Sequence, residues 1–277
     1  MQFSTIRTIA VTATLTTALV ACASAPETGR SQLLLIGPSQ EAELGFQAFQ
    51  QMKRETPVSR NRKESEQLRE VGRRIAAVAP VPHAQWEFVL FDEGDTANAF
   101  ALPGGKVGVH TGILPITKDE TGLATVIAHE VAHVVAHHGA ERMSQEVMIQ
   151  LGGTALSAAL GANAGVTRDL AMQAYGIGTA LGVTLPYSRT QELEADHLGL
   201  LYMARAGYDP RGAVDFWRRF QDYSRRKGGQ PPEFLSTHPV DSKRISEIQR
   251  LLPRAIAEYE GAKRGGWRIV PAPKHKN

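Results

Sequence analysis

The sequence TGLATVIAHEVAHVVAHH, at residues 121–138, is the stretch on which the fold and the chemistry depend. Its apolar residues recur at helical spacing, so it predicts a helix. Residues four apart lie on one face of a helix, which brings the imidazoles of His129 and His133 together. Two imidazoles on one face can hold one metal ion, and Glu130 follows the first of them directly. The stretch therefore predicts half of a metal site with a base beside it.

This arrangement has the pattern H-E-x-x-H, which on a helix is typical of zinc peptidases. In such a site the two histidines bind zinc and the glutamate handles a proton of the attacking water. The competing interpretation is a helix that carries solvated histidines and no metal. A catalytic zinc needs three protein ligands, so the choice depends on what the rest of the chain supplies.

Helix geometry argues against a third ligand from the same helix. The longer pattern H-E-x-x-H-x-x-G-x-x-H fails, because the chain has Ala136 and Gly139 at the required positions. His137 shares the stripe of His133, but three ligands over two helical turns span about 12 Å, too far to converge on one ion at about 2 Å. We therefore expect His137 and His138 to lie at the surface or to support the ligands from behind.

The best candidate for the third ligand lies in YSRTQELEAD, at residues 187–196. Glu192 and Asp196 are four apart and share one helix face. Glu192 can bind zinc, and Asp196 can accept the N–H of a ligand histidine and so set its tautomer. Glu194 points elsewhere on a helix and is the alternative ligand. Carboxylates on an exposed helix are usually only solvated, so the histidine pair carries the metal interpretation.

Hydropathy patterning predicts one mainly helical α+β domain over residues 38–258, with a small sheet beside the motif helix. Strands are expected at 86–91, 97–102 and 106–110, with Pro-Gly-Gly turning the chain between the last two. Helices are expected at 39–54, 61–78, 119–139, 190–206, 210–226 and 240–258, the motif helix ending at Gly139 and the next one at Gly207.

The strand at 97–102 is a candidate for substrate binding. An extended peptide can pair with the edge of a sheet, which assigns Asn98, Ala99 and Phe100 to contacts with the substrate. An ordinary buried strand fits the same alternating pattern, and both interpretations remain open.

Residues 143–184 are rich in Ala, Gly, Leu and Met and almost free of charge. The segment does not reach the roughly 20 unbroken apolar residues of a membrane span, because Arg168 and Asp169 are among the residues that interrupt it. A buried helical hairpin is the favoured interpretation. A mobile cover or a membrane-leaning element over the active site is the alternative.

The first 21 residues have the parts of an export signal. Arg7 gives a positive start, residues 9–20 are apolar, and LVAC at 19–22 ends the segment like a bacterial lipobox. Cys22 is the only cysteine of the chain. If it carries a lipid, no thiol remains for a metal, and zinc must use histidine and carboxylate donors. We therefore expect lipidation at Cys22 and a tether over 22–37. A plain cleaved signal peptide is the alternative.

The expected location follows from this segment. Export and a lipid anchor predict the bacterial cell envelope, and Ala23 after the cysteine is typical of sorting to the outer membrane, facing the periplasm. Composition is ordinary for a globular protein, with 42% hydrophobic and 21% charged residues and a net charge of +3. The sequence has no basic stripe with interleaved aromatics, so nucleic acid is not an expected partner. Residues 259–277 are expected to form a C-terminal tail.

HEVAH and SRTQELEAD, at this spacing, resemble peptidase family M48. The segments ANAFALPGGKVGVHTGIL, AGYDP and LSTHPVDSKRI also look like family signatures, and the resemblance covers roughly residues 40–252. The family includes CAAX prenyl proteases, HtpX-type proteases, mitochondrial Oma-type proteases and soluble periplasmic members. This chain looks like the soluble bacterial lipoprotein branch.

The resemblance implies a gluzincin-type zincin fold with one Zn²⁺ per chain, bound by His129, His133 and Glu192. It selects Glu192 over Glu194 and gives Asp196 the role of supporting the ligand histidines. The implied function is a zinc-dependent endopeptidase that uses Glu130 as its base and acts on misfolded or misassembled envelope proteins. A competing function is a chaperone-like or scaffold lipoprotein with structural zinc, against which the intact Glu130 argues.

His238, in the segment STHP, is a further candidate. It can stabilise the oxyanion of the reaction, and in some relatives the matching histidine approaches the metal and holds the enzyme latent. A histidine before a proline is otherwise an ordinary loop or cap residue. Tyr187 and Arg189 are weaker candidates for positioning the substrate.

Overall fold

A computed structural model describes residues 22–145, 187–227, 232–239 and 241–267. The predicted export signal at 1–21 lies outside the described residues, as does nearly all of the apolar segment at 143–184. Within the described ranges, none of the helices combines the length and the apolar character that a membrane crossing needs.

A small mixed sheet lies at the centre of the fold. It consists of β3 (Glu87–Phe91), β4 (Ala99–Leu102) and β5 (Lys106–His110), in the order β3-β5-β4. β5 is the middle strand, parallel to β3 and antiparallel to β4. The three predicted strands are therefore confirmed. Among the residues that the structure describes, β4 is an edge strand, with one side free of strand pairing.

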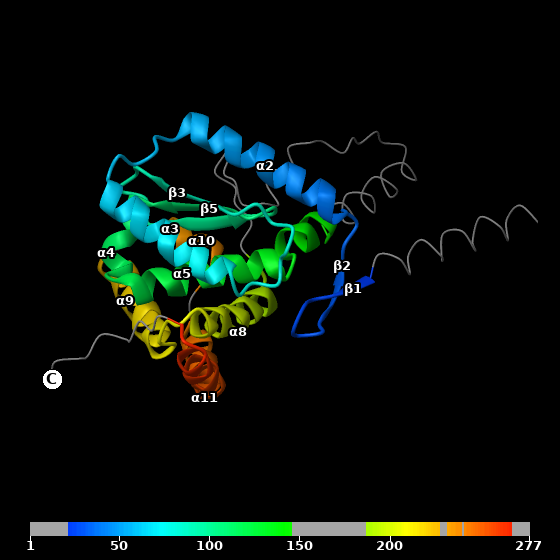
Figure 1. Cartoon of the computed structure of the whole chain (residues 1–277). Helices are drawn as coiled ribbons and strands as arrows, with labels where there is room; N and C mark the ends of the chain where they lie inside the picture. Colours follow the sequence, from blue (N-terminus) through cyan, green and yellow to red (C-terminus); the bar gives the residue numbers. More distant parts are fainter. Residues whose placement is uncertain (1–21, 146–186, 228–231, 240, 268–277) are drawn as a thin grey trace, which may run out of the picture.

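The two faces of the sheet pack against different helices (Figure 1). Helix α2 (Pro38–Glu55) covers one face, where Phe49 meets Phe91 and Phe100. The other face packs toward α3 (Arg62–Ala76) and α5 (Glu120–Val135). Successive side chains of a strand point to opposite faces, and this alternation supplies both layers with apolar residues. The main core contains the members of the second face, which are Phe88, Leu90, Ala99, Ala101, Val107 and Val109.

Helix α5 is buried on nearly every side. Asp119 caps its N-terminus by accepting a hydrogen bond from the Gly122 backbone at 2.9 Å. A helix that is apolar all round belongs in a core, and here α5 lies between the sheet and the helices of the second half of the chain (Figure 1).

The predicted end of this helix at Gly139 is wrong. Helix α5 ends at Val135, and His137 has a positive φ of 52°, in the left-handed region. A second helical segment starts at residue 138 and continues to residue 145, where the described range ends. A left-handed residue just past a helix is ordinarily a glycine, so the sequence pattern pointed to Gly139 instead.

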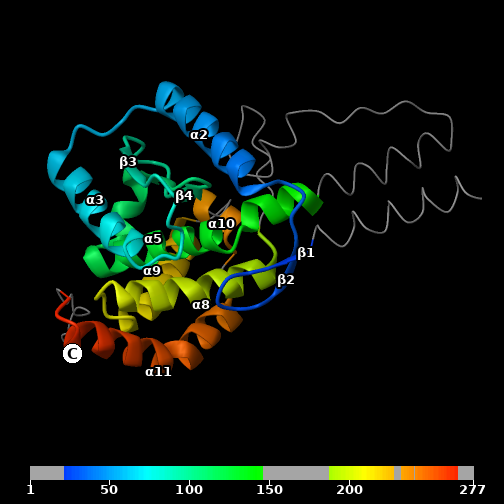
Figure 2. The same cartoon turned by 45° about the vertical axis from the view of Figure 1, so that its right-hand side comes forward.

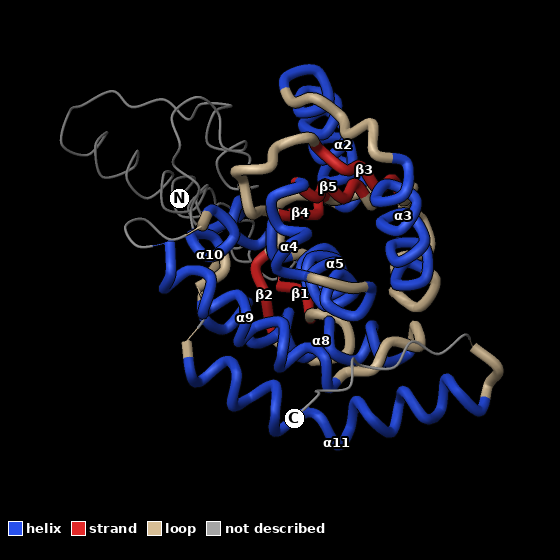
Figure 3. Tube along the Cα trace, turned by 90° about the vertical axis from the view of Figure 1, so that its left-hand side faces the viewer, coloured by secondary structure: helices blue, strands red, loops and turns tan. Residues whose placement is uncertain are grey.

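The second half of the chain supplies helices below α5. They are α8 (Arg189–Arg205), α9 (Arg211–Lys227), the short α10 (Glu233–Thr237) and α11 (Ser242–Arg264). A capping box between Ser188 and Gln191 starts α8. The predicted helices at 190–206, 210–226 and 240–258 are confirmed, but α11 continues past residue 258 into the predicted tail. Figure 3 shows α8 lying between α5 and α11. The connecting segment after β5 holds η1 (Thr111–Ile113) and α4 (Leu114–Thr117).

The N-terminal segment differs from the tether predicted for 22–37. Strands β1 (Cys22–Ser24) and β2 (Ser31–Leu33) form an antiparallel hairpin. Figure 2 shows this hairpin beside α8 and the helical segment that follows α5. An ion pair of 3.0 Å between Arg205 and Glu27 is one of its ties to the body. Charged side chains at the turn make these ties, and hydropathy alone does not show them.

Gly199 sets how closely α5 and α8 approach. A Cβ at this position would lie 2.9 Å from the backbone nitrogen of His129 and 3.0 Å from the backbone carbon of Ala128. Both neighbours are main-chain atoms, so no side chain can move aside. We expect Gly199→Ala to lower the free energy of unfolding by about 1–3 kcal/mol, the usual cost of overpacking.

Urea unfolding of the metal-free protein measures this effect. Gly261→Ala is the matched control, because Gly261 also lies in a helix but has nothing within 4 Å of the added Cβ. The control is expected to gain about 0.4–1 kcal/mol. Equal stability changes in the two variants would show that the α5–α8 spacing tolerates the extra carbon.

Candidate metal centre

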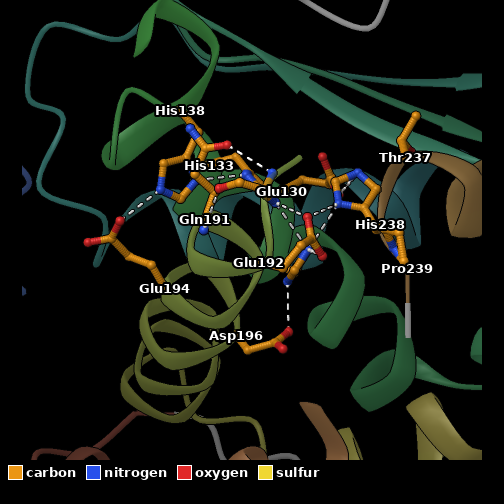
Figure 4. A network of polar contacts seen from close by, with 12 residues as sticks. Glu130, His133, His138, Gln191, Glu192, Glu194, Asp196, Thr237, His238 and Pro239 are labelled. Carbon is orange, nitrogen blue, oxygen red and sulfur yellow. Dashed lines mark hydrogen bonds and ion pairs between the residues drawn. The ribbon is translucent and has the colours of Figure 1, made fainter. Parts of the chain in front are cut away.

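The predicted site residues come together from three segments. His129, Glu130 and His133 lie on α5, Glu192 and Asp196 lie on α8, and His238 follows α10 (Figure 4). All six side chains are buried. The crossing of α5 and α8 therefore places the two halves of the sequence pattern at one point.

The geometry of the cluster matches a tetrahedral ion site. His129 Nε2 and His133 Nε2 are 3.1 Å apart. The carboxylate of Glu192 lies 3.4 Å from His133 Nε2 through Oε1 and 3.6 Å from His129 Nε2 through Oε2. Donors at about 2.0–2.1 Å around a tetrahedral zinc lie about 3.3 Å from one another. Two imidazoles and one carboxylate are also a common donor set for catalytic zinc. These residues fit the metal.

His238 lies at the fourth position. Its Nδ1 is 3.3 Å from His129 Nε2 and 2.9 Å from Glu192 Oε1, and one donor atom from each of the four residues falls within 4.8 Å of the others. Its ring stacks on Phe234, with centroids 4.5 Å apart. A catalytic zinc keeps one position open, and four protein ligands are typical of a closed site. In this conformation His238 fills the corner that a substrate or water would need.

Asp196 supports His129 from behind the cluster. Its Oδ1 lies 3.1 Å from His129 Nδ1. A carboxylate in this position accepts the ring N–H and leaves the lone pair of Nε2 toward the metal position. This is the placement expected for Asp196 from the sequence.

Arg244 is a central residue that sequence reasoning did not single out. Its guanidinium donates two hydrogen bonds of 2.7 Å to the carboxylate of Asp196 and also contacts Glu192. It donates to the carbonyl of Pro239 at 2.9 Å and stacks over the ring of Trp217. A buried arginine that pairs two buried carboxylates keeps both charged. The only available signal was its place in the segment LSTHPVDSKRI.

The charges of the cluster depend on these contacts. Burial alone would raise the pKa of Glu192, but Arg244 and His238 hold that pKa well below its ordinary value. Burial also opposes the proton on His129, yet the carboxylates of Asp196 and Glu192 raise its pKa to about 9. Burial lowers the pKa of His133 well below its ordinary value. Glu192 is therefore ionised and His133 neutral, as metal ligands need to be, whereas His129 has to release a proton when a metal binds.

Glu130 has the environment of a general base. Burial raises the pKa of its carboxyl. The backbone of Ala101, on the edge strand β4, hydrogen-bonds this carboxyl, and His238 Nε2 lies 3.5 Å from its Oε1. A base whose pKa is raised toward neutrality accepts and returns a proton more readily near pH 7.

The three remaining candidates near the motif have different surroundings. His137 is partly exposed and pairs with Glu41 of α2 at 2.9 Å. His138 is fully buried, which excludes the surface alternative and leaves the predicted position behind the ligands; its ring contacts His133 and Glu194. Glu194 lies at His138 and not at the metal cluster, which leaves Glu192 as the carboxylate beside the two histidines.

Strand β4 offers its backbone to the site. The side chain of Phe100 packs on Phe49 of α2, and Asn98 Oδ1 accepts a hydrogen bond from the Ala99 backbone. The backbone N–H of His110 donates to the Asn98 carbonyl at 3.0 Å. Asn98 and every second residue after it therefore direct their main-chain groups toward β5. The main-chain groups of Ala99 and Ala101 therefore face the open edge.

The two weaker candidates, Tyr187 and Arg189, lie in different places relative to the metal cluster. Tyr187 stacks on His133, with ring centroids 3.9 Å apart, and burial raises its pKa to about 12. Tyr187 is thus a neutral phenol at the site at neutral pH. Arg189 pairs with Asp241 at 2.7 Å, away from the metal cluster, and both side chains are exposed.

Known proteins resemble the chain over the region that contains this site. The family model described as Peptidase family M48 matches residues 62–252. The mitochondrial metalloendopeptidase OMA1 of Schizosaccharomyces pombe is 40% identical over 188 residues, which is 68% of this chain and 53% of that protein. The metalloendopeptidase OMA1 of Bos taurus is 32% identical over 251 residues, covering 83% and 46%. The beta-barrel assembly-enhancing protease of Yersinia pestis is 30% identical over 233 residues, covering 81% and 46%. The chain spans about half the length of these relatives.

Proposed function

Because the chain belongs to peptidase family M48, we propose that it is a zinc-dependent endopeptidase. The observation that carries this proposal is the position of Glu130. A buried carboxyl with a raised pKa stands beside a His129, His133 and Glu192 cluster of tetrahedral dimensions. A purely structural zinc site has no use for such a base.

The metal would be held by His129, His133 and Glu192. When bound, zinc supplies Lewis acidity, which polarises the scissile carbonyl and makes water more acidic. Glu130 accepts the proton of the attacking water and delivers it to the leaving amine. Asp196 and Arg244 keep the ligand side chains in place throughout.

His238 has to leave the fourth position before the site can work. Its backbone is held by Arg244, which donates to the carbonyls of His238 and Pro239, and its ring is held by the stack on Phe234 and the 2.9 Å contact with Glu192. A rotation of the side chain opens the corner and turns the imidazole toward the substrate. There it can donate a hydrogen bond to the developing oxyanion, together with Tyr187.

An extended peptide would bind along β4. The open-edge groups of Ala99 and Ala101 can pair with its main chain, as in other cases where a peptide adds a strand to a sheet. The Ala101 backbone already contacts Glu130, so a peptide on this edge passes the base. Of the three predicted substrate-binding residues, Ala99 would then be a main-chain partner of the peptide, whereas the main-chain groups of Asn98 and Phe100 face β5.

We further propose misfolded or misassembled envelope proteins as the substrates. Relatives named beta-barrel assembly-enhancing protease in Yersinia pestis and Escherichia coli support this class. A lipid on Cys22 would hold the enzyme on the outer membrane, facing the periplasm. Metabolic labelling with a radioactive fatty acid is expected to mark the wild-type chain and not Cys22→Ser. Equal labelling of the two proteins would show that Cys22 does not carry a lipid.

A proteolysis assay tests the function. The purified protein with zinc is expected to cleave an unfolded β-barrel protein and to spare the same protein once folded in detergent. Chelation by EDTA should stop cleavage, and zinc should restore it. The competing function, a scaffold with structural zinc, predicts binding of the unfolded protein without cleavage even at long incubation.

Metal binding gives a further prediction. Glu192→Ala is expected to weaken zinc binding roughly 10²- to 10³-fold, because apparent zinc binding energies of about 10–16 kcal/mol are shared among about four ligands. Competition against a zinc chelator measures the dissociation constant. Glu66→Ala, which removes an exposed carboxylate of α3, is the control and should bind like wild type. Tight zinc binding by Glu192→Ala would mean that another residue is the third ligand.

A further inference from the structure

A second buried cluster stands behind the metal centre. His138 is fully buried, and its Nδ1 lies 2.8 Å from Nδ1 of His133. Its other ring nitrogen, Nε2, lies 2.9 Å from Oε2 of Glu194. Figure 4 shows the three side chains in a row that ends at the metal cluster. None of the catalytic roles proposed above uses His138 or Glu194.

The row determines where the ring protons lie. A carboxylate only accepts hydrogen bonds, so His138 carries its proton on Nε2 and donates it to Glu194. Nδ1 of His138 is then an acceptor, and Nδ1 of His133 has to be the donor. His133 is left with a lone pair on Nε2, the atom that lies 3.1 Å from His129 Nε2 in the metal cluster. Glu194 and His138 thus do for His133 what Asp196 does for His129.

The backbone break after α5 makes this row possible. Residues five apart on a continuous helix point about 140° away from each other. The left-handed conformation of His137 and the new helical segment from residue 138 turn His138 back toward His133. The side chain of His137 binds Glu41 at 2.9 Å, which secures the break.

The outer end of the row is held by the N-terminal hairpin. Arg30 Nε donates to Glu194 Oε2 at 2.6 Å, and the hydroxyl of Thr28 donates to Glu194 Oε1. The same guanidinium donates a bidentate pair of hydrogen bonds to the carboxylate of Glu141, at 2.7 and 2.8 Å. Glu141 in turn accepts from Gln191 of α8 at 2.8 Å. Arg30 therefore joins three parts of the fold at one point, namely the hairpin, α8, and the helical segment that follows α5.

On the premise of the metal centre proposed above, we propose that the hairpin at 22–33 contributes to zinc binding by fixing the tautomer of His133. Arg30 is a positioning residue: it holds Glu194, Glu194 fixes the proton of His138, and His138 fixes the tautomer of His133. Loss of any member frees His133 to put its proton on Nε2, where it competes with zinc. The alternative is that these contacts only fasten the hairpin to the body.

Zinc affinity of the purified full chain is the first readout. Arg30→Met, Glu194→Gln and His138→Phe are each expected to raise the zinc dissociation constant roughly 10- to 100-fold, the usual effect of losing a partner of a metal ligand. Arg205→Met is the matched control. It removes another arginine that ties the hairpin to the body, through Glu27, but does not touch the row. We expect it to bind zinc within about twofold of wild type.

The tautomer of His133 is the second readout, and fastening alone would not change it. Nitrogen NMR of the metal-free protein, with His133 assigned by comparison with His133→Gln, should find the proton on Nδ1 in wild type and in Arg205→Met. In Arg30→Met and Glu194→Gln it should shift toward Nε2. Arg30→Lys keeps the charge at Glu194 and should restore most of the zinc affinity, which separates the effect from misfolding.

The outcomes distinguish this inference from the proposed function. Wild-type zinc affinity and an unchanged tautomer in Arg30→Met and Glu194→Gln would overturn the role of the row and leave the metal centre intact. Equal losses in Arg205→Met and Arg30→Met would show that fastening of the hairpin is what matters. A wild-type chain that binds no zinc would instead refute the metal centre itself.

Discussion

Glu130→Gln is expected to lower peptidase activity roughly 10²- to 10⁴-fold, the range that general acid–base catalysis contributes. The amide keeps the size and shape of the side chain but cannot accept the proton of the attacking water. Zinc binding should stay close to wild type, because Glu130 is not among the four donors that converge within 4.8 Å. The measurement is cleavage of an unfolded protein by variant and wild type at equal zinc content.

Stability provides the internal control for this variant. Glu130 is a buried carboxyl whose pKa burial raises, so its charged form is costly to bury. An amide removes that cost, and the metal-free variant should unfold at the same or a higher urea concentration than wild type. Wild-type cleavage by a folded, zinc-loaded Glu130→Gln protein would falsify the mechanism.

Arg244→Met is expected to lower the free energy of unfolding of the metal-free protein by about 3–5 kcal/mol, the typical cost of leaving buried charges without their partner. Arg244 is the guanidinium that contacts both Glu192 and Asp196, and all three side chains are buried. Methionine fills much of the space over Trp217 but supplies no charge. Two carboxylates would then face the two ligand histidines alone.

Zinc should repair part of this loss. A divalent cation between His129, His133 and Glu192 replaces some of the missing positive charge, so saturating zinc should stabilise Arg244→Met more than wild type. Urea unfolding with EDTA and with zinc measures both effects. Arg205→Met removes a partly exposed ion pair and should cost no more than about 1 kcal/mol. A similar small loss in Arg244→Met would show that the two carboxylates are neutral or solvated.

The sequence was sufficient for the parts of the site that follow from helix periodicity. The four-residue spacing places His129 and His133 together, and the same rule applied to α8 separates Glu192 and Asp196 from Glu194. The strands were equally predictable from alternation and the Pro-Gly-Gly turn. Each of these inferences needs only contacts within one regular element.

What could not be predicted depends on backbone breaks and on contacts between distant segments. His138 reaches His133 only because His137 adopts a left-handed conformation without being a glycine. Arg244 reads as one more charged residue at the start of a helix, and its burial between two carboxylates appears only when α11 packs on α8. The hairpin at 22–33 is polar and short, so its order comes from partners more than 100 residues away, such as Glu141 and Glu194.

The strand that begins at Cys22 also limits how far the protein can reach. A free chain over 22–37 would span up to about 50 Å between an anchor and the folded body. The pairing of Cys22 with Leu33 folds that length back on itself and fastens it beside α8. A lipid on Cys22 would then leave almost no slack between the bilayer and the folded body. Cleavage would be confined to chains that arrive at that height above the membrane, so that distance as well as sequence would select the substrate.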